Sequence, residues 1–357
     1  MSLVELLRRH HDAFLQRYQA KLTPAIRQAM EAMLRCRVDS ERCSHWGCQG
    51  CAQQAEFPLS CGHRSCPQCQ HNTTQDWLHR QEQKLLPVDY FMVTFTVPFE
   101  LRTLAQAQPE AVYQAMFTVA ADTLRSFAAR SAQLGGEIGL TGVLHTHSRR
   151  RDYHPHIHFM IPAGSLVANQ QWRKLRGDYL FNAFNLAKVW RARLLAELDR
   201  RLGIQAPSIL PRKWVVDCRR VGRGLPALQY LSRYLYRGVL PDQQIVSVHD
   251  GQVTFRYQDS RSGEEKLRTL AAVEFLWLIL QHVLPKGLRR VRDYGLLSGG
   301  CRQRLRQIQL MLAVAGSVLP PPLKPKRTVA VRACPSCHQP MQFLGVRRRK
   351  RPATVTA

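Results

Sequence analysis

The sequence predicts an α+β protein with a cysteine-rich module before its main domain and a basic tail after it. Strand-like runs of β-branched and aromatic residues alternate with long amphipathic helical runs. Seven of the 11 cysteines fall between Cys36 and Cys69, and the chain after Arg302 is basic and proline-containing. We therefore expect an N-terminal helical segment at 1–35, a cysteine-rich module at 36–80, a main domain at 88–300 and a basic tail at 301–357.

The individual elements follow from the spacing of the apolar residues. Apolar residues that recur every three or four positions predict helices, at 3–34, 75–86, 109–134, 183–202, 225–237 and 273–284. Runs of β-branched and aromatic residues that stop at proline, glycine or polar turns predict strands, at 90–97, 138–148, 153–161, 213–218, 245–249 and 252–257. The strands on either side of 149–152 form a predicted hairpin.

The charge balance indicates a polyanionic partner. Lysine and arginine total 52 and aspartate and glutamate total 25, which gives a net charge of +27 on 357 residues. Nucleic acid is the first expectation for this charge, ahead of a merely soluble basic protein. Hydrophobic residues make up 45% of the chain, enough for a core. No apolar run approaches the ~18 residues of a membrane span, and Arg8 and Arg9 interrupt any signal-peptide core, so we expect a cytoplasmic protein.

The cysteine spacing predicts structural zinc rather than disulfides. An odd number of cysteines without a secretion signal argues against a disulfide framework. Two C-x-x-C pairs, at 48–51 and 66–69, can each turn two thiolates toward one point, as tetrahedral zinc sites require. The remaining ligands could form a second site, and the spacing leaves the grouping open. The candidate zinc ligands are Cys36, Cys43, Cys48, Cys51, Cys61, His63, Cys66 and Cys69.

A further pair, Cys334 and Cys337, lies near the C-terminus. Since no second pair lies nearby in the sequence, it is interpreted as a degraded zinc ribbon or as a pair that borrows ligands such as His338. For the N-terminal cysteines the alternative is a set of buried or redox-active thiols, and their paired spacing favours metal.

A histidine cluster on the predicted hairpin indicates a second kind of metal site. His156 and His158 alternate with Ile157, so both imidazoles point to one face of the strand. A symmetric hairpin pairs His145 with His156 and His147 with His154, which places His145 on the same face as a third ligand. Neutral imidazoles on rigid strands suit a divalent cation. The alternative for an H-x-H pair alone is a hydrogen-bonded surface strand.

The predicted helix at 225–237 carries tyrosines and arginines on one stripe. At ~100° per residue, Tyr230, Arg233, Tyr234 and Arg237 share a face opposite the leucines. A tyrosine can act as a covalent nucleophile when nearby cations favour its phenolate. Packed boundary residues with wet hydroxyls are the commoner role for such tyrosines, and the histidine cluster elsewhere in the chain favours catalysis.

Together these motifs resemble the rolling-circle insertion-sequence transposases of the ninety-one group and its ISCR relatives. Residues 154–162 match the HUH signature of two histidines around a hydrophobic residue, and residues 230–234 resemble its paired-tyrosine motif. Residues 60–70 with Trp77 resemble the zinc module of that family, and 284–295 resemble a further family segment. The likeness covers the chain from about Cys36 to Gly295.

This resemblance implies a fold, a chemistry and a set of partners. The fold is an HUH nuclease domain, a central antiparallel sheet flanked by helices with the histidines on a middle strand. His156, His158 and His145 hold Mg²⁺ or Mn²⁺ against a scissile phosphate of single-stranded DNA at a transposon end. Tyr230 or Tyr234 attacks this phosphate, forms a 5′-phosphotyrosine link and frees a 3′-hydroxyl. Arg233 and Arg237 bind the DNA. Structural Zn²⁺ holds the cysteine module, and the protein is implied to work at the bacterial nucleoid.

Two other functions remain open at this stage. A plasmid replication initiator or relaxase would use the same chemistry on a different DNA. A non-catalytic zinc-dependent nucleic-acid-binding regulator would account for the charge and the cysteines, although it leaves the histidine hairpin and the tyrosine stripe unexplained.

Overall fold

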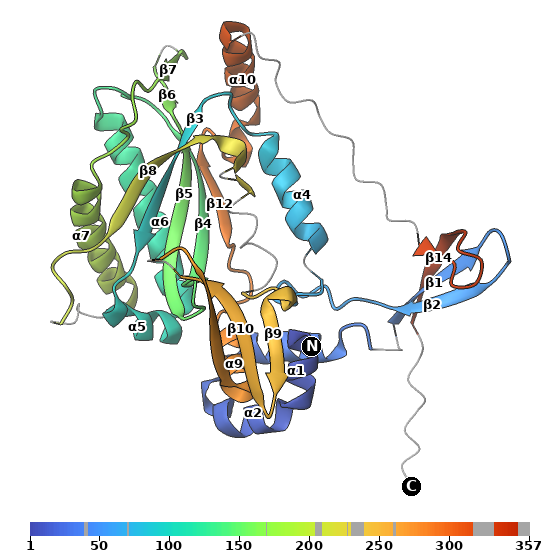
Figure 1. Cartoon of the computed structure of the whole chain (residues 1–357). Helices are drawn as coiled ribbons and strands as arrows, with labels where there is room; N and C mark the ends of the chain where they lie inside the picture. Colours follow the sequence, from blue (N-terminus) through green and yellow to red (C-terminus); the bar gives the residue numbers. More distant parts are fainter. Residues whose placement is uncertain are drawn as a thin grey trace.

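The fold of the chain is α+β, as the sequence predicts (Figure 1). We describe it from a computed structural model, which covers residues 1–38, 42–69, 71–168, 170–203, 209–226, 228–229, 239–259, 262–316 and 332–348. No helix within these ranges is long and apolar enough to cross a membrane.

A five-stranded antiparallel sheet forms the centre of the molecule, in the order β12-β4-β5-β3-β8. The strands predicted at 90–97, 138–148 and 153–161 are confirmed to within one residue at each end. The strand predicted at 213–218 begins and ends later, and the strand at Val291–Gly295 was not predicted. The hairpin occupies the second and third positions of the sheet. The strands are β3 (Asp89–Thr96), β4 (Gly139–His147), β5 (Tyr153–Pro162), β8 (Val216–Arg223) and β12 (Val291–Gly295).

One face of this sheet packs against helices. Phe95, Phe159 and Trp190 are fully buried there. The ring centroid of Phe95 lies 6.1 Å from that of Phe159 and 5.0 Å from that of Trp190. The indole N–H of Trp190 donates to the Thr96 carbonyl at 3.0 Å, so this buried donor is satisfied. The elements of this layer are η2 (Phe99–Leu101), α5 (Arg102–Ala107), α6 (Pro109–Arg130) and α7 (Ala183–Leu202). The small pair β6 (Gly164–Leu166) and β7 (Trp172–Lys174) packs through Leu166 and Trp172 with the apolar cluster of the opposite face.

Two helices pack against the other face of the sheet. Trp77, Leu305 and Ile308 pack there against Met92, Val143 and Met160 of the sheet. They belong to α4 (His71–Glu82) and to α10 (Arg302–Gly316), which follows η4 (Gly299–Cys301). We call this the imidazole face, because β5 also turns its even-numbered histidines to it.

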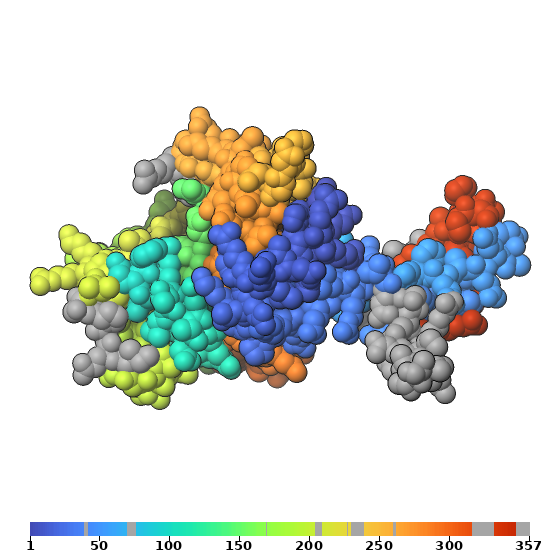
Figure 2. All heavy atoms as spheres, turned by 90° about the horizontal axis from the view of Figure 1, so that it is seen from below, coloured from blue at the N-terminus to red at the C-terminus, as the bar shows by residue number. Residues whose placement is uncertain are grey.

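The N-terminal helices form a second unit with a three-stranded sheet. The predicted helix at 3–34 is divided into α1 (Leu3–Arg9), α2 (His11–Tyr18), η1 (Gln19–Lys21) and α3 (Pro24–Arg35). The last of these breaks falls where Thr23 caps α3 and Pro24 occupies its first turn. These helices bury their apolar faces against α9 (Ala272–Leu280). Figure 2 shows the N-terminal segment, in blue, beside the orange segment that includes α9. The sheet contains β9 (Ile245–His249), β10 (Gln252–Gln258) and β11 (Glu265–Ala271). A short helical turn, η3 (Asp242–Gln244), directly precedes β9.

The cysteine-rich module joins both ends of the chain. A four-stranded sheet in the order β13-β14-β1-β2 stands to one side of the main body (Figure 1). Its strands are β1 (Arg42–Cys48), β2 (Gln54–Pro58), β13 (Arg332–Ala333) and β14 (Pro340–Arg348). Within the basic tail expected at 301–357, α10 packs on the main domain and β14 pairs with β1.

The packing of the helix face leads to a stability prediction. Replacing Phe95 by alanine should lower the free energy of unfolding by about 3–5 kcal/mol, because a fully buried ring is removed from a closely packed core. Phe99, with 73% of its surface exposed, is the matched control, and its replacement by alanine should cost less than about 1 kcal/mol. Urea denaturation of both variants measures the difference, and equal losses would contradict the packing described here.

Candidate metal and catalytic sites

Three histidines from the central hairpin converge on one point of the imidazole face. His145 on β4 and His156 and His158 on β5 place one ring nitrogen each within 4.8 Å of the others. The ring centroids of His145 lie 5.2 Å from His156 and 4.6 Å from His158. This spacing fits three ligands around a single divalent cation.

The strand register that creates the cluster matches the sequence prediction at one position and differs at the next. His145 stands directly opposite His156, as the symmetric hairpin requires. The expected pairing of His147 with His154 is wrong, because the register shifts between His145 and His147 and His147 pairs with Tyr153. The extra residue is a β-bulge next to the turn, which sequence periodicity does not reveal. It turns His147 toward His282, 5.5 Å away between ring centroids.

Hydrogen bonds fix the orientation of two of the rings. The Nδ1–H of His156 donates to the His154 carbonyl at 2.7 Å, which leaves the lone pair on Nε2. His158 Nδ1 lies 2.8 Å from Thr94 Oγ1 on the neighbouring strand. Partners of this kind fix the tautomer and direction of metal-binding imidazoles. Sequence reasoning missed Thr94, which occupies the position opposite His158 in the register.

Burial keeps these imidazoles neutral. Burial, with a smaller contribution from the Arg102 guanidinium, lowers the pKa of His156 to about 4, although the hydrogen bond to the His154 carbonyl opposes the shift. Burial and neighbouring rings hold the pKa values of His145 and His158 well below 6.5. Arg102 also donates to His154 Nδ1 at 2.6 Å. Neutral imidazole is the form that binds a metal, so the donor set fits a divalent cation at neutral pH.

The predicted tyrosine helix lies mostly outside the described residues. Tyr230, Arg233, Tyr234 and Arg237 are among those that the structure does not describe. Residues 224–226, 228 and 229 have helical backbone. Leu228 is fully buried in the cluster of Met92, Val143 and Met160, so the first turn of this helix packs on the imidazole face.

The first cysteine cluster contains Cys36, Cys61, Cys66 and Cys69, whose sulfurs all lie within 4.8 Å of one another. Cys36 Sγ is 3.4 Å from Cys69 Sγ and 3.7 Å from Cys66 Sγ. A hydrogen bond from Cys66 lowers the pKa of Cys61 to about 5, whereas the same contact and burial raise that of Cys66. Four sulfurs around one point are consistent with structural zinc.

The second cluster contains Cys48, Cys51, Cys334 and Cys337, again within 4.8 Å. Cys48 Sγ lies 3.4 Å from Cys337 Sγ, although 289 positions separate them in the chain. The structure therefore distributes the pairs at 48–51 and 66–69 over different clusters. It gives the C-terminal pair four-sulfur surroundings that also fit structural zinc. The sequence carries one indication of this pairing, since the isolated C-x-x-C at 334–337 needs two further ligands from elsewhere in the chain.

Two of the expected zinc ligands belong to neither cluster. Cys43 lies in β1 opposite Pro58 and Arg347. His63 is near the first cluster, but its Nδ1 accepts the backbone N–H of Ser65 at 3.2 Å. Since each cluster already contains four sulfurs, the expected set of seven cysteines and one histidine is replaced by eight cysteines.

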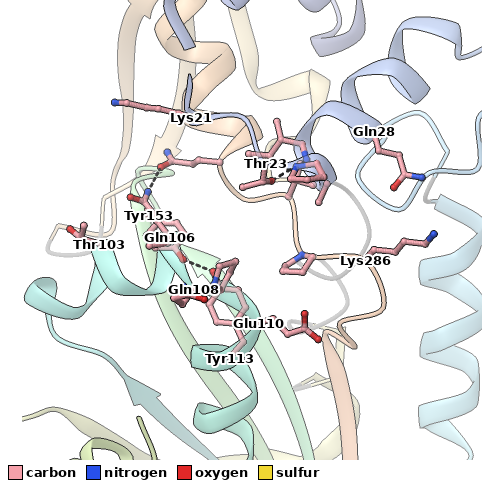
Figure 3. Close-up of a pocket in the computed structure, with 18 of the residues that line it drawn as sticks. Lys21, Thr23, Gln28, Thr103, Gln106, Gln108, Glu110, Tyr113, Tyr153 and Lys286 are labelled. Atoms are coloured by element: carbon pink, nitrogen blue, oxygen red, sulfur yellow. Dashed lines mark hydrogen bonds between the residues drawn. The ribbon is translucent and has the colours of Figure 1, made fainter. Parts of the chain in front are cut away.

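A cavity of about 640 Å³ lies between α3, α5, α6 and α9 (Figure 3). None of its lining residues belongs to the three clusters. Tyr113 and Tyr153 line it and share a short hydrogen bond between their hydroxyls. Its charged side chains are Lys21, Lys286 and Glu110, which do not form a metal-ligand set. The chemistry-bearing groups are therefore at the clusters rather than in this cavity.

The protein thus has candidate metal sites of two kinds, a three-imidazole cluster on an antiparallel sheet and two tetracysteine clusters. Comparison with known proteins identifies it as a transposase. Residues 6–97 match the family described as "Transposase zinc-binding domain", and residues 139–304 match "Putative transposase". The chain belongs to the IS91 family of transposases.

Its relatives cover most of the chain. It is 30% identical to the putative transposase y4qJ of Sinorhizobium fredii strain NGR234, over 95% of this chain and 93% of that protein. It is 27% identical to the transposase of insertion sequence element IS801 from Pseudomonas savastanoi pv. phaseolicola, over 81% and 74%. Among solved structures it matches the conjugative relaxase TrwC in complex with oriT DNA, at a TM-score of 0.28 and 18% identity, covering 63% of this chain and 71% of that one.

The two cysteine clusters predict the zinc content of the protein. The purified chain should contain two zinc ions, and Cys334→Ser with Cys337→Ser should remove one, because two sulfurs rarely suffice for structural zinc. Cys218→Ser is the control, since Cys218 lies in β8 away from both clusters. Atomic absorption on the three proteins measures this. A double variant that keeps both ions would exclude the C-terminal pair as ligands.

The lowered pKa values predict how metal binding depends on pH. Protons compete with a cation only below the pKa of its ligands, so an imidazole with a pKa of about 4 stays available well into acid. Mn²⁺ affinity should change little between about pH 7 and 5.5 and fall as the pH approaches 4. Calorimetric titration of folded protein, checked by circular dichroism at each pH, tests this. A tenfold loss by pH 5.5 would indicate ligands with ordinary pKa values near 6.5.

Proposed function

We propose that this transposase nicks and rejoins single-stranded DNA at transposon ends through a 5′-phosphotyrosine intermediate, as in rolling-circle transposition. The observation that carries the proposal is the imidazole cluster, because three neutral ring nitrogens within 4.8 Å form a cation site on a protein of net charge +27. The zinc clusters and charge alone would also fit a non-catalytic regulator. That alternative gives no reason to bury three imidazoles around one point.

The three imidazole nitrogens determine which cations the site can hold. Imidazole nitrogen suits transition metals, whereas Mg²⁺ prefers oxygen ligands and keeps several waters. His145, His156 and His158 would therefore hold Mn²⁺ or, with water completing its shell, Mg²⁺. The bound cation would polarise the scissile phosphate and offset its charge.

The chain itself supplies the nucleophile and the cationic surroundings. In the proposal the hydroxyl oxygen of Tyr230 or Tyr234 forms a bond to phosphorus while the bond to the 3′-oxygen breaks. The phenol proton is released and the leaving strand ends in a 3′-hydroxyl, so one phosphate ester replaces another and no ATP is needed. The second tyrosine or the 3′-hydroxyl reverses the step. Arg233 and Arg237 would favour the phenolate and contact the DNA.

The position of Leu228 supports this role for the tyrosine helix. Leu228 lies two positions before Tyr230 and is buried against the sheet residues that flank His158 and His145. Arg102 and Arg219 are close enough to lower the pKa values of His156 and His158, so both can also attract a phosphate to the same face.

A covalent adduct is the test of this function. The full chain, incubated with Mn²⁺ or Mg²⁺ and a single strand that carries the element's end, should form a protein–DNA species that resists SDS. Tyr230→Phe with Tyr234→Phe, or His156→Ala with His158→Ala, should abolish it, since the nucleophile or the cation site is lost. Either single tyrosine change should leave partial activity.

Matched substitutions exclude unspecific effects in this experiment. Tyr179→Phe and His249→Ala change the same residue types at exposed positions and should leave the adduct unaffected. The proposal fails if no adduct forms with either metal, or if the adduct survives in the double tyrosine variant.

A further inference from the structure

A basic groove of about 570 Å³ lies beside the imidazole cluster, between α4, β12 and the loop at 284–290. Asp293 and Val291 on its floor pair with Thr141 and Val143, so they share the imidazole face with His145. The carbonyl of Arg290 accepts the backbone N–H of Leu144 at 2.9 Å, one position before His145. The groove and the cluster are therefore neighbours on one surface.

Six cationic side chains line this groove against one carboxylate. The carboxylate of Asp293 is already engaged, since Lys84 forms an ion pair with it, Thr141 Oγ1 donates at 2.7 Å and Gln81 Nε2 donates at 3.1 Å. It therefore neutralises little of the remaining charge. The cations are Arg64, Arg80, Lys84, Arg289, Arg290 and Arg302.

Three of these cations are exposed to solvent. In the described part of the chain, no ion pair joins Arg80, Arg289 or Arg302 to a carboxylate. Trp77 lines the same groove, and its buried indole N–H has no acceptor among the described residues. Like charges repel in the empty groove, and a bound polyanion removes that repulsion while it supplies acceptors.

Arg64 connects the groove to the first cysteine cluster. It lies between Cys61 and Cys66 in the chain, and both are members of that cluster. Its guanidinium donates to three carbonyls of the adjacent loop, Leu288 at 2.6 Å, Leu284 at 2.8 Å, and Pro285. Because the same loop carries Arg289 and Arg290, the geometry of the cysteine cluster fixes where these two cations stand.

We propose that this groove binds the sugar-phosphate backbone of a single DNA strand beside the imidazole cluster, and that Arg64 is a positioning residue that ties the groove to the cysteine cluster. The identity of the strand rests on the proposed function. The segment at 284–295 receives a role through this proposal, as the loop and strand that form one wall and the floor of the groove.

Binding of a fluorescent oligothymidylate without divalent metal, measured by anisotropy, tests the groove. Changing Arg80, Arg289 and Arg302 to glutamine should weaken binding about 10- to 100-fold. The slope of log K against log salt should fall by about 2, since each phosphate neutralised on a single strand contributes roughly 0.7. The control changes Arg125, Arg130 and Lys188 to glutamine, three cations of α6 and α7 on the opposite side of the sheet, and should lose less than about threefold.

A second measurement tests Arg64 as a positioning residue. Arg64→Gln should weaken oligothymidylate binding in the full chain while zinc content stays unchanged. Its effect should largely vanish in a background in which Arg289 and Arg290 are both changed to glutamine, because Arg64 acts through the loop that carries these two cations. Additive losses would show that Arg64 acts independently of this loop and would overturn its positioning role.

The outcomes separate the groove from the catalytic proposal. Equal losses in the groove and control triples would overturn the groove, whatever the adduct assay gives. Equal weakening for duplex DNA of the same length would make the groove a general DNA-backbone site and overturn its assignment to a single strand. Loss of oligothymidylate binding confined to the groove triple supports the groove even if no covalent adduct forms, in which case only the proposed catalysis fails.

Discussion

The register of the central hairpin is the constraint on which the rest of the site depends. A slip of one residue between β4 and β5 would move His145 to the helix face and leave two imidazoles on the other. Several contacts hold the register. Leu144 and Ile157 pair on the helix face and are buried there, and the turn closes through the Ser148 N–H to the Asp152 carbonyl at 2.9 Å. Arg268 of β11 also binds Asp152 at 2.8 Å.

The cysteine clusters impose order at places where the apolar core is small. Among the described residues, Cys48, Cys334 and Met341 form the buried group around the second cluster, and the residues packed against them are only partly buried. This core is too small to hold a four-stranded sheet together. Metal binding would supply the missing folding energy there. The first cluster differs, because Cys36 and Cys66 belong to the large core that joins α1, α3 and α9. One cluster therefore ties the chain ends together, and the other ties the N-terminal helices to the main domain.

Much of the central domain could be predicted from the sequence because its signals are local. Alternation identified the face of His156 and His158, and a symmetric turn gave the partner of His145. The bulge after His145 was missed because it depends on how the turn packs against β11 and His282. The grouping of the cysteines could not be derived, since Cys48 and Cys337 meet only through long-range strand pairing. Likewise, β14 was predicted as tail because its exposed residues carry little apolar periodicity.

The two faces of the sheet divide structural and chemical roles between them. Phe95, Phe159 and Trp190 make the helix face a closed core, which leaves no room there for a charged ligand. On the other face α4 and α10 pack on part of the sheet, and the buried, neutral imidazoles lie beside a groove lined by exposed arginines. A cation site next to unpaired cations is electrostatically unfavourable unless an anion lies between them. The arrangement thus favours a ligand that carries several negative charges in a row, and a DNA strand is such a ligand.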